Sequence, residues 1–452
     1  MATAVEQLAK NANWGALAKA TELKQRIMFV IGALLVYRLG TYIPVPGVDP
    51  AIWNEIFTKK GGGILDMFNM FSGGALSRMT IFALNIMPYI SASIIMQLAT
   101  AMSKHLEELK KEGEAGRMKI NQYTRYLTVL LATVQAYGLA VGLEAMQGEM
   151  GPAVINPGMF FRISTVITIV GGTVFLMWLG EQITSRGVGN GISLIIFAGI
   201  VAELPRAVGS TLELTRQGTF SGVELLMLVL MVVGVIGLIV FVERAQRRVV
   251  VQYPKRQMGN KMTAGETNHI PLKLNTSGVI PPIFASSLLL LPLTVVNFSG
   301  LSQESDFWAD VIRYLQHGQP VYMALYGLLI AFFCFFYTAI VFNPEDNAET
   351  LRKYGGFIPG IRPGKNTADY LDFVLTRITM IGAIYLVFIC LLPELLIAKY
   401  NMPFYFGGTS LLIVVSVTMD TVAQIHSHMI AHQYEGLIKK TKLRGRNRAQ
   451  RR

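Results

Sequence analysis

Charged side chains are scarce in this chain. Asp, Glu, Lys and Arg make up 15% of its 452 residues, whereas a soluble protein carries about 25%. Hydrophobic residues make up 52%. Because a protein surrounded by lipid does not need a charged surface, this composition favours a polytopic membrane protein over a soluble one.

Cysteine and catalytic motifs are equally scarce. The two cysteines, Cys334 and Cys390, both lie inside apolar runs, so neither a disulfide framework nor a metal site is expected. The chain contains no HExxH, no GxSxG and no phosphate-binding loop. Residues 1–26 are polar and no small-residue cleavage site follows the first apolar run, which argues against a secretory signal. We therefore expect no enzyme activity, no metal and no cofactor.

Long apolar runs, by contrast, are abundant. A helix needs about 20 apolar residues to span a bilayer, and ten segments qualify as candidates: 27–42, 75–99, 123–143, 163–179, 189–207, 223–242, 277–296, 321–342, 378–396 and 404–423. Segments this long and continuous span as helices rather than strands. The fold class predicted is an all-α polytopic membrane protein with ten transmembrane helices.

The positive charges predict the orientation of these spans. Lys and Arg are concentrated before the first span, in alternate connections and in the tail, for example in 104–119, 244–273, 352–365 and 439–452. The connection at 301–319 instead holds three carboxylates and a single arginine. Cationic loops stay on the cytoplasmic side, so we expect both termini to be cytoplasmic.

Two of the cytoplasmic connections are long, namely 243–276 and 343–377. The second contains GGFIPGIRPG at 355–364, whose glycines and prolines disfavour a helix and favour a stiff, exposed turn with Arg362 near its tip. A single loop of this kind is usually just solvated. Two basic loops on the same side favour a docking platform for an acidic protein or for RNA.

The spans hold almost no ionisable side chains. Arg38, Arg162, Glu181 and Glu243 fall at span ends, and Asp420 lies close to the cytoplasmic end of the last span. Ion-coupled transporters usually need carboxylates or histidines at mid-depth. An ion-coupled solute transporter is therefore the second hypothesis, behind a passive channel, and a membrane enzyme is the third.

A short apolar block on glycines lies between the first two spans. In GGGILDMFNMFSGGALSR, at 61–78, residues 64–71 cover about 12 Å as a helix, less than half of a ~30 Å hydrocarbon core. The flanking glycines permit backbone turns. The block could cover a pore mouth, or it could be an interfacial re-entrant piece without a gating role.

Isoleucines recur four residues apart in two spans, and two more lie singly in two other spans. The six of interest are Ile86, Ile90, Ile192, Ile196, Ile283 and Ile413. Such stripes ordinarily belong to a core or face lipid, and spacing alone does not show that the six meet.

Motifs along the whole chain resemble those of bacterial SecY, the family of channel subunits of the Sec protein translocon. They include IFALNIMPYISASIIMQL, KKEGEAGR, FLMWLGEQITSRGVGNGISLIIFAGI, GVIPPIFASS, FFCFFYTAIVFNP, GGFIPGIRPG and PFYFGGTSLLIVV. The resemblance implies ten helices in two inverted five-helix halves around a central pore. The expected parts are a cytoplasmic N-terminus (1–26), an N-terminal half (27–222) with a plug at 61–74, a C-terminal half (223–424) and a basic tail (425–452).

The resemblance also implies roles for individual residues. The six isoleucines match the apolar pore ring, and Ile64, Leu65, Met67, Phe68, Met70 and Phe71 match the plug. Gln135 and Asn275 match a polar cluster at the lateral gate, to which Ser91 and Gln97 are added on their position in the second span. Residues Arg247, Arg248, Lys255, Arg256 and Arg362 lie in loops that match those binding SecA or the ribosome.

The implied function is translocation of unfolded secretory proteins across the inner membrane, with sideways release of membrane-protein helices into lipid. Implied partners are SecE and SecG in a heterotrimer, the SecA motor ATPase, the ribosome, signal sequences and nascent chains, and SecDF and YidC. Two details depart from the common family pattern: Asn85 stands where a small residue is usual, and Pro281–Pro282 stand where one proline is usual. Both bear on how readily the gate opens.

Overall fold

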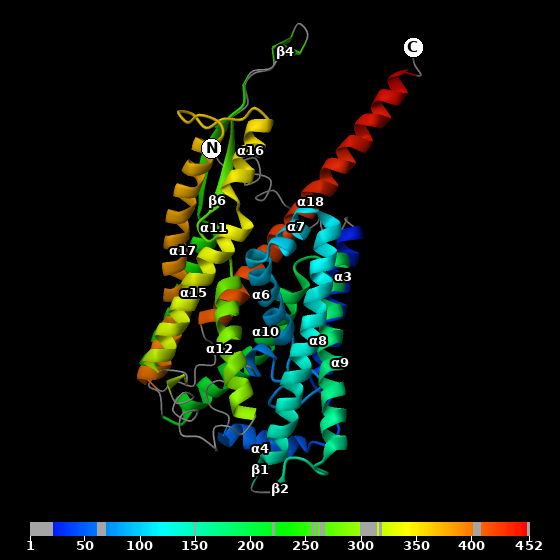
Figure 1. Ribbon diagram of the computed structural model, residues 1–452, viewed down its shortest axis with the longest axis vertical. Coiled ribbons are helices and arrows are strands. Elements are labelled where there is room, and N and C mark those ends of the chain that lie inside the picture. Colours follow the sequence, from blue (N-terminus) through cyan, green and yellow to red (C-terminus); the bar gives the residue numbers. More distant parts are fainter. Residues whose placement is uncertain are drawn as a thin grey trace.

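A computed structural model gives the structure of the chain. The residues it describes are 21–60, 69–148, 151–218, 222–254, 257–258, 261–262, 267–298, 314–315, 319–400 and 408–449. Element labels follow Figure 1.

The N-terminal half is a layer of antiparallel helices. Its elements are α3 (Thr21–Gly40), α4 (Pro50–Lys60), α6 (Met87–Met102), α7 (Lys104–Lys111), α8 (Glu114–Ala145), β1 (Gln147–Gly148), β2 (Gly151–Pro152), α9 (Met159–Arg186) and α10 (Gly191–Arg216). In this half α8 packs against α6 and α9, and α9 packs against α3 and α10.

In its described residues, the C-terminal half adds six helices and a hairpin. Its helices are α11 (Gly222–Arg244), α12 (Ile280–Phe298), α15 (Pro320–Val341), α16 (Pro344–Lys353), α17 (Lys365–Tyr400) and α18 (Gly408–Ala449). Here α15 packs against α12 and α17, and α18 packs against α11 and α17. The two halves touch where α12 meets α6 and α8, and where α18 meets α3 and α10.

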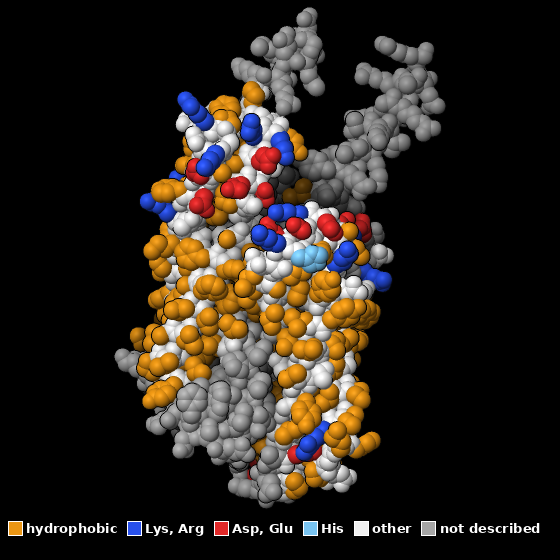
Figure 2. All heavy atoms as spheres, viewed as in Figure 1, with side chains coloured by type: hydrophobic (Ala, Val, Ile, Leu, Met, Phe, Trp, Pro, Cys, Tyr) orange, Lys and Arg blue, Asp and Glu red, His pale blue; other side chains and the backbone are white. Residues whose placement is uncertain are grey.

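The long helices run along the long axis of the molecule, and charged groups gather at one end. Figure 1 shows α4 lying across one end, while α7, α16, the hairpin and the far part of α18 lie at the other. On the face drawn in Figure 2, hydrophobic side chains form a broad belt and Lys, Arg, Asp and Glu gather above it. Such an apolar belt is what a bilayer-spanning protein presents to lipid.

Each of the ten predicted spans coincides with a helix. Seven described helices are long and apolar enough to cross a membrane, and α6 and α12 are shorter apolar helices. The remaining span corresponds to α3, which has 20 residues. The all-α, ten-span prediction is therefore confirmed in outline, although the boundaries of several spans differ.

The second predicted span, 75–99, is helical only in its second part. Residues 75–86 form turns, and α6 begins at Met87. Met79 and Asn85 both have positive φ, +44° and +50°, a left-handed conformation that a helix cannot contain. Pro88 sits in the first turn of α6, where a missing N–H is tolerated.

The predicted loop 343–377 is mostly helix, contrary to expectation. Asn343 caps α16, since its side chain accepts a hydrogen bond from the Glu345 N–H at 3.0 Å, and α17 begins at Lys365. The connection itself shrinks to residues 354–364. There Gly355, Gly360 and Gly364 have left-handed φ values, in agreement with the turn predicted for this motif.

The predicted loop 243–276 is a β-hairpin. Strands β3 (Gln246–Gln252) and β6 (Thr267–Lys273) pair antiparallel, with Gln246 opposite Lys273 and Gln252 opposite Thr267. Two further short strands, β4 (Gln257–Met258) and β5 (Lys261–Met262), pair beyond them. The basic tail, expected to follow the last span, continues helix α18 as far as Ala449.

Candidate functional site: pore, seal and docking platform

The structure places the six predicted ring isoleucines in one hydrophobic cluster. Ile86, Ile90, Ile196 and Ile413 are among its buried members, and Ile192 and Ile283 pack against it half-buried. The residues come from α6, α10, α12 and α18, of which α6 contacts α12 and α10 contacts α18. The cluster therefore joins the two halves of the molecule.

Helix starts position several of these isoleucines. Ile86 is the N-cap residue of α6, and Ile192 lies in the first turn of α10. The side chain of Asn190 caps α10 by accepting hydrogen bonds from the N–H groups of Ile192 (3.1 Å) and Ser193 (3.4 Å). Because a side-chain cap satisfies otherwise unpaired N–H groups, it holds the first turn, and with it Ile192, in place.

The end of the predicted plug packs against the same cluster. Met70 and Phe71 are 9% and 2% exposed and belong to it. Ile64, Leu65, Met67 and Phe68 lie outside the described residues. The described end of the predicted plug therefore belongs to the same apolar core as the six isoleucines; its role as a plug stays a prediction.

Four consecutive backbone carbonyls at the end of the plug accept hydrogen bonds from side chains; we call this the carbonyl clamp. The Phe71 oxygen accepts from Asn85 Nδ2 (2.5 Å), the Ser72 oxygen from Tyr37 Oη (3.2 Å), the Gly73 oxygen from Arg38 Nη1 (2.7 Å) and Arg78 Nη2 (3.1 Å), and the Gly74 oxygen from Arg78 Nε (3.0 Å) and Ser77 Oγ (3.0 Å). The donors come from α3 and from the turns between the plug and α6. This backbone is thereby fixed to the first half of the molecule.

The glycines in the clamp are required by its geometry. Gly73 and Gly74 have φ of +66° and +79°, which favours glycine. A Cβ on Gly199, in α10, would lie 2.7 Å from the Phe71 carbonyl oxygen, so only glycine lets α10 approach so closely. The sequence suggested that this glycine pair acts as a free hinge. Instead both carbonyls are held by arginine, which favours a fixed base for the plug.

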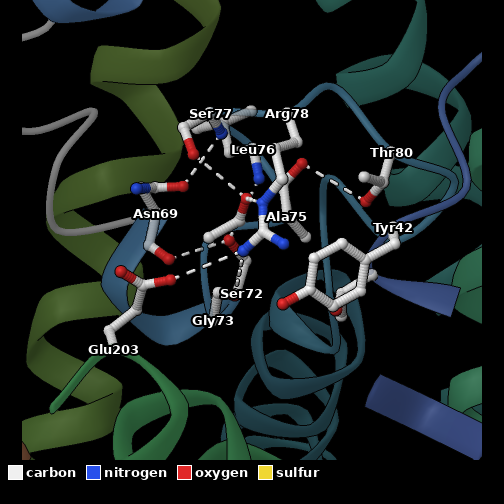
Figure 3. A network of polar contacts seen from close by, with 12 residues as sticks. Tyr42, Asn69, Ser72, Gly73, Ala75, Leu76, Ser77, Arg78, Thr80 and Glu203 are labelled. Carbon is white, nitrogen blue, oxygen red and sulfur yellow. Dashed lines mark hydrogen bonds and ion pairs between the residues drawn. The ribbon is translucent and has the colours of Figure 1, made fainter. Parts of the chain in front are cut away.

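Arg78 lies at the centre of the clamp. Figure 3 shows its guanidinium between the Glu203 carboxylate and the backbone near Gly73, with the Tyr42 ring beside it. The ion pair with Glu203 is 3.6 Å long, and the guanidinium carbon lies 4.3 Å from the Tyr42 ring centre. The one acidic and two basic side chains, counting Arg38, form a charged cluster beside the apolar one.

Sequence analysis missed Glu203. It lies within the predicted span 189–207, and its side chain is 17% exposed in α10. It is a further ionisable group near the end of a predicted span, four residues before position 207, that the sequence analysis did not single out. The available signal was a glutamate in an otherwise apolar run, but its partner Arg78 is 125 residues away in the chain, so the pairing is not visible in sequence.

The four predicted gate residues do not bond one another. Ser91 and Gln135 are buried on α6 and α8, and Gln97 donates to Ser93 Oγ at 3.3 Å. Asn275 donates to Glu243 Oε1 at 2.7 Å and accepts from Ser277 Oγ at 3.0 Å. Among the described residues, no hydrogen bond joins any two of these four, so the expected polar cluster is not formed between them.

The two long connections pack together. We call the β3–β6 hairpin with residues 354–364 the docking platform, after the role predicted for it. Gln252 and Phe357 exchange both backbone hydrogen bonds at 2.9 Å. A separate hydrophobic cluster lies beneath, formed by Val249, Val251, Leu272, Ile358, Leu371, Val374 and Ile378. Arg247, Arg248 and Arg362 are exposed on it, while Lys255 and Arg256 lie outside the described residues.

Comparisons with known proteins give a consistent picture. A family model described as SecY matches residues 80–422. The chain is 57% identical to the protein translocase subunit SecY of Rickettsia typhi, covering 94% of this chain and 98% of that protein. It is 55% identical to the subunit of the same name from Escherichia coli K12, covering 94% and 96%.

Solved structures resemble it in fold. A structure described as a protein conducting channel superposes with a TM-score of 0.65 at 18% identity, covering 89% of this chain and 92% of that one. Sec61 in a canine ribosome-channel complex superposes with a TM-score of 0.59 at 18% identity, over the same shares. At these identities the likeness concerns the fold, and it agrees with the ten-helix architecture described above.

Proposed function

The chain belongs to the SecY family, and from this premise we propose that it forms the pore of a protein translocase. Unfolded secretory proteins pass through it, and membrane-protein helices leave it sideways into lipid. The single observation that carries this proposal is that all six isoleucines belong to, or pack against, one apolar core that joins the two halves.

The chemistry of that cluster suits a protein-conducting neck. Isoleucine is β-branched and stiff, and its side chain offers no hydrogen bond to an ion. A narrow apolar constriction resists wetting, which blocks ions at rest. The same side chains can part around a chain of almost any sequence, because they make no specific contact with it.

A crosslink to a stalled secretory chain tests the pore. We would place a cysteine at Ile283, with Cys334 and Cys390 replaced by alanine, and a matched cysteine at Leu288, which is 42% exposed on the same helix. The stalled chain should crosslink to the cysteine at 283 and not to that at 288. Equal labelling, or none at 283, would contradict the pore assignment.

Residues 61–74 act as the plug in this proposal, with the carbonyl clamp as its base. Two facts support it: Met70 and Phe71 are buried in the same apolar core as the isoleucines, and the backbone that follows is tied to α3. Residues 71–74 then stay in place on opening.

The remaining roles concern partners and location. We assign the docking platform to the SecA motor or the ribosome, because Arg247, Arg248 and Arg362 give it an exposed positive surface. SecE and SecG complete a heterotrimer. The chain lies in the bacterial inner membrane, with both termini on the cytoplasmic side, as its loop charges favour.

An ion-coupled transporter finds no support. The half-buried carboxylate inside α10, Glu203, is paired with Arg78, and a carboxylate neutralised in this way is not a free site for a coupling ion. Across the described part of the chain, no group of His, Cys, Asp and Glu side chains is arranged to hold a metal ion.

A further inference from the structure

An apolar groove of about 610 Å³ runs between α15 and α17. Gly327 and Ala331 line it from α15, and Met380, Ile384, Phe388 and Leu395 line it from α17. These last four side chains are 53–62% exposed although they belong to membrane spans. The groove therefore opens on the lipid side of the helical bundle.

Small residues create the groove. Gly327 and Ala331 are four residues apart, so they lie one above the other on one face of α15. A Cβ on Gly327 would already touch Val387 (3.3 Å) and Leu391 (3.4 Å) of α17. The two helices therefore pack closely at Gly327 and Ala331, which form the bottom of the groove, and larger side chains on either side line it.

A positive charge stands at one end of the groove. Ile384, Phe388 and Leu395 follow Arg377 by 7, 11 and 18 residues, so all four share one face of α17. The Arg377 guanidinium lies over the Phe373 ring at 4.2 Å, one turn toward the docking platform, as a snorkelling arginine does. Among the described residues its charge has no ion-pair partner.

The nearest carboxylates on α17 face elsewhere. Asp369 and Asp372 line a different, polar pocket between α16 and α17, together with Glu345 and Glu349. Arg377 is therefore the charged group that stands at the mouth of the apolar groove, and an anion is the ligand that complements it.

The dimensions match one lipid chain. From Arg377 to Phe388 the helix rises about 16 Å, and one leaflet of a ~30 Å hydrocarbon core is about 15 Å thick. We propose that the α15–α17 groove binds an anionic phospholipid, with its phosphate at Arg377 and one acyl chain between Ala331 and Phe388. A transmembrane helix of a partner fits less well, because it would have to supply a carboxylate at the level of Arg377. The proposal rests on the membrane location given above but not on what passes through the pore.

Lipid retention by the purified complex tests the headgroup site. Native mass spectrometry would compare palmitoyl-oleoyl phosphatidylglycerol with the phosphatidylcholine of the same chains, in the wild type, Arg377→Gln and the control Arg117→Gln. Arg117 is an exposed arginine on α8. We expect Arg377→Gln to weaken phosphatidylglycerol retention about fivefold, with phosphatidylcholine and the control unchanged. Equal retention by wild type and Arg377→Gln would overturn the proposal.

A second pair of variants tests the groove itself. Ala331→Phe fills it, whereas Leu328→Phe adds an aromatic ring at a lipid-facing position of α15 that is 65% exposed. Only Ala331→Phe should reduce retention of phosphatidylglycerol. A cysteine at 331 that crosslinks to a companion protein in membranes, in place of lipid binding, would overturn the proposal in favour of a helix. Neither readout involves transport, so failure here is distinct from failure of the pore assignment.

Discussion

Asn85 destabilises the fold in two ways, through its backbone conformation and through an unpaired buried oxygen, and this points to a role in closing the pore. It holds a left-handed φ of +50°, which is unfavourable for a residue with a Cβ although asparagine tolerates it better than most. Its Oδ1 is buried without a hydrogen-bond partner in the described chain, a further cost of about 1–3 kcal/mol. Its Nδ2 nevertheless donates to the Phe71 carbonyl at 2.5 Å. What the side chain supplies is a contact to the plug.

Asn85→Gly isolates that contact, because glycine adopts φ +50° freely but cannot donate to Phe71. Losing one hydrogen bond weakens the closed state by about 1 kcal/mol, which corresponds to about a fivefold rise in resting ion leak. The leak would be measured on the purified complex in liposomes without substrate.

Asn85→Ala serves as the control for backbone strain. It loses the same hydrogen bond but also has to hold a left-handed φ, at a cost of about 1–2 kcal/mol, so its melting temperature should fall while that of Asn85→Gly changes little. A leak from Asn85→Gly no larger than that of the wild type would rule out this side chain as part of the seal.

The spans were the most predictable elements, and the segments near the pore and outside the membrane were the least. A run of about 20 apolar residues determines a helix in lipid almost by itself, which is why all ten were found. Residues 75–86 are also largely apolar but form turns. Their conformation depends on contacts with helices far away in sequence: Phe82 lies against Gly40 of α3, Ile81 against Gly172 of α9, and Arg78 pairs with Glu203 of α10. The β3–β6 hairpin was not predicted, because the charged residues of this segment suggested a solvated loop. Val249 and Val251, on the same face of β3, are in fact buried in a core with Ile358.

The role of individual residues was predictable only through family resemblance. The spacing of the isoleucines did not show that they meet, and the clamp donors, such as Tyr37 and Arg38, carry no motif at all. Asn275 also bonds to Glu243 rather than to another predicted gate residue. The roles of these residues depend on contacts between segments far apart in the chain, and a single sequence does not show such contacts.

The docking platform should depend on its own small core. Ile358 is 5% exposed beneath it, and Ile358→Ala should destabilise residues 354–364 by about 2–5 kcal/mol. SecA-driven transport into proteoliposomes should fall, and protease cleavage in 354–364 should become faster. Resting ion leak should not change, since the pore cluster is separate.

Arg362→Glu provides the matched comparison, because its side chain is exposed and not part of that core. It should impair SecA-driven transport as strongly while leaving the protease pattern of the wild type. If Arg362→Glu transports normally, the exposed charge does not dock the motor. If Ile358→Ala transports normally despite faster cleavage, the order of the turn is not required.

At the scale of the whole molecule, closure is a contact between two halves. The contact on the side of the expected lateral gate lies where α12 meets α6 and α8. Several buried polar atoms on these helices, among them Gln97 Oε1, Gln135 Oε1 and Ser287 Oγ, have no hydrogen-bond partner in the described chain. Hydrogen bonds between polar residues of different helices would strengthen this seam, but unpaired polar atoms in a buried seam do the opposite. They lower the free energy needed to open it.

Gln135→Leu should strengthen the seam. Leucine is close in volume to glutamine and removes a buried oxygen without a partner, which stabilises the closed state by about 1–3 kcal/mol. Substrates with weakly hydrophobic signal sequences gain little from entering the seam, so their transport should fall about tenfold, while strongly hydrophobic signals should still open it. The measurement is the ratio of transport of two substrates that differ only in signal hydrophobicity. Gln122→Leu, at an exposed position on the same helix, should leave that ratio unchanged; an unchanged ratio in Gln135→Leu would mean that the free energy of opening is set elsewhere than at this seam.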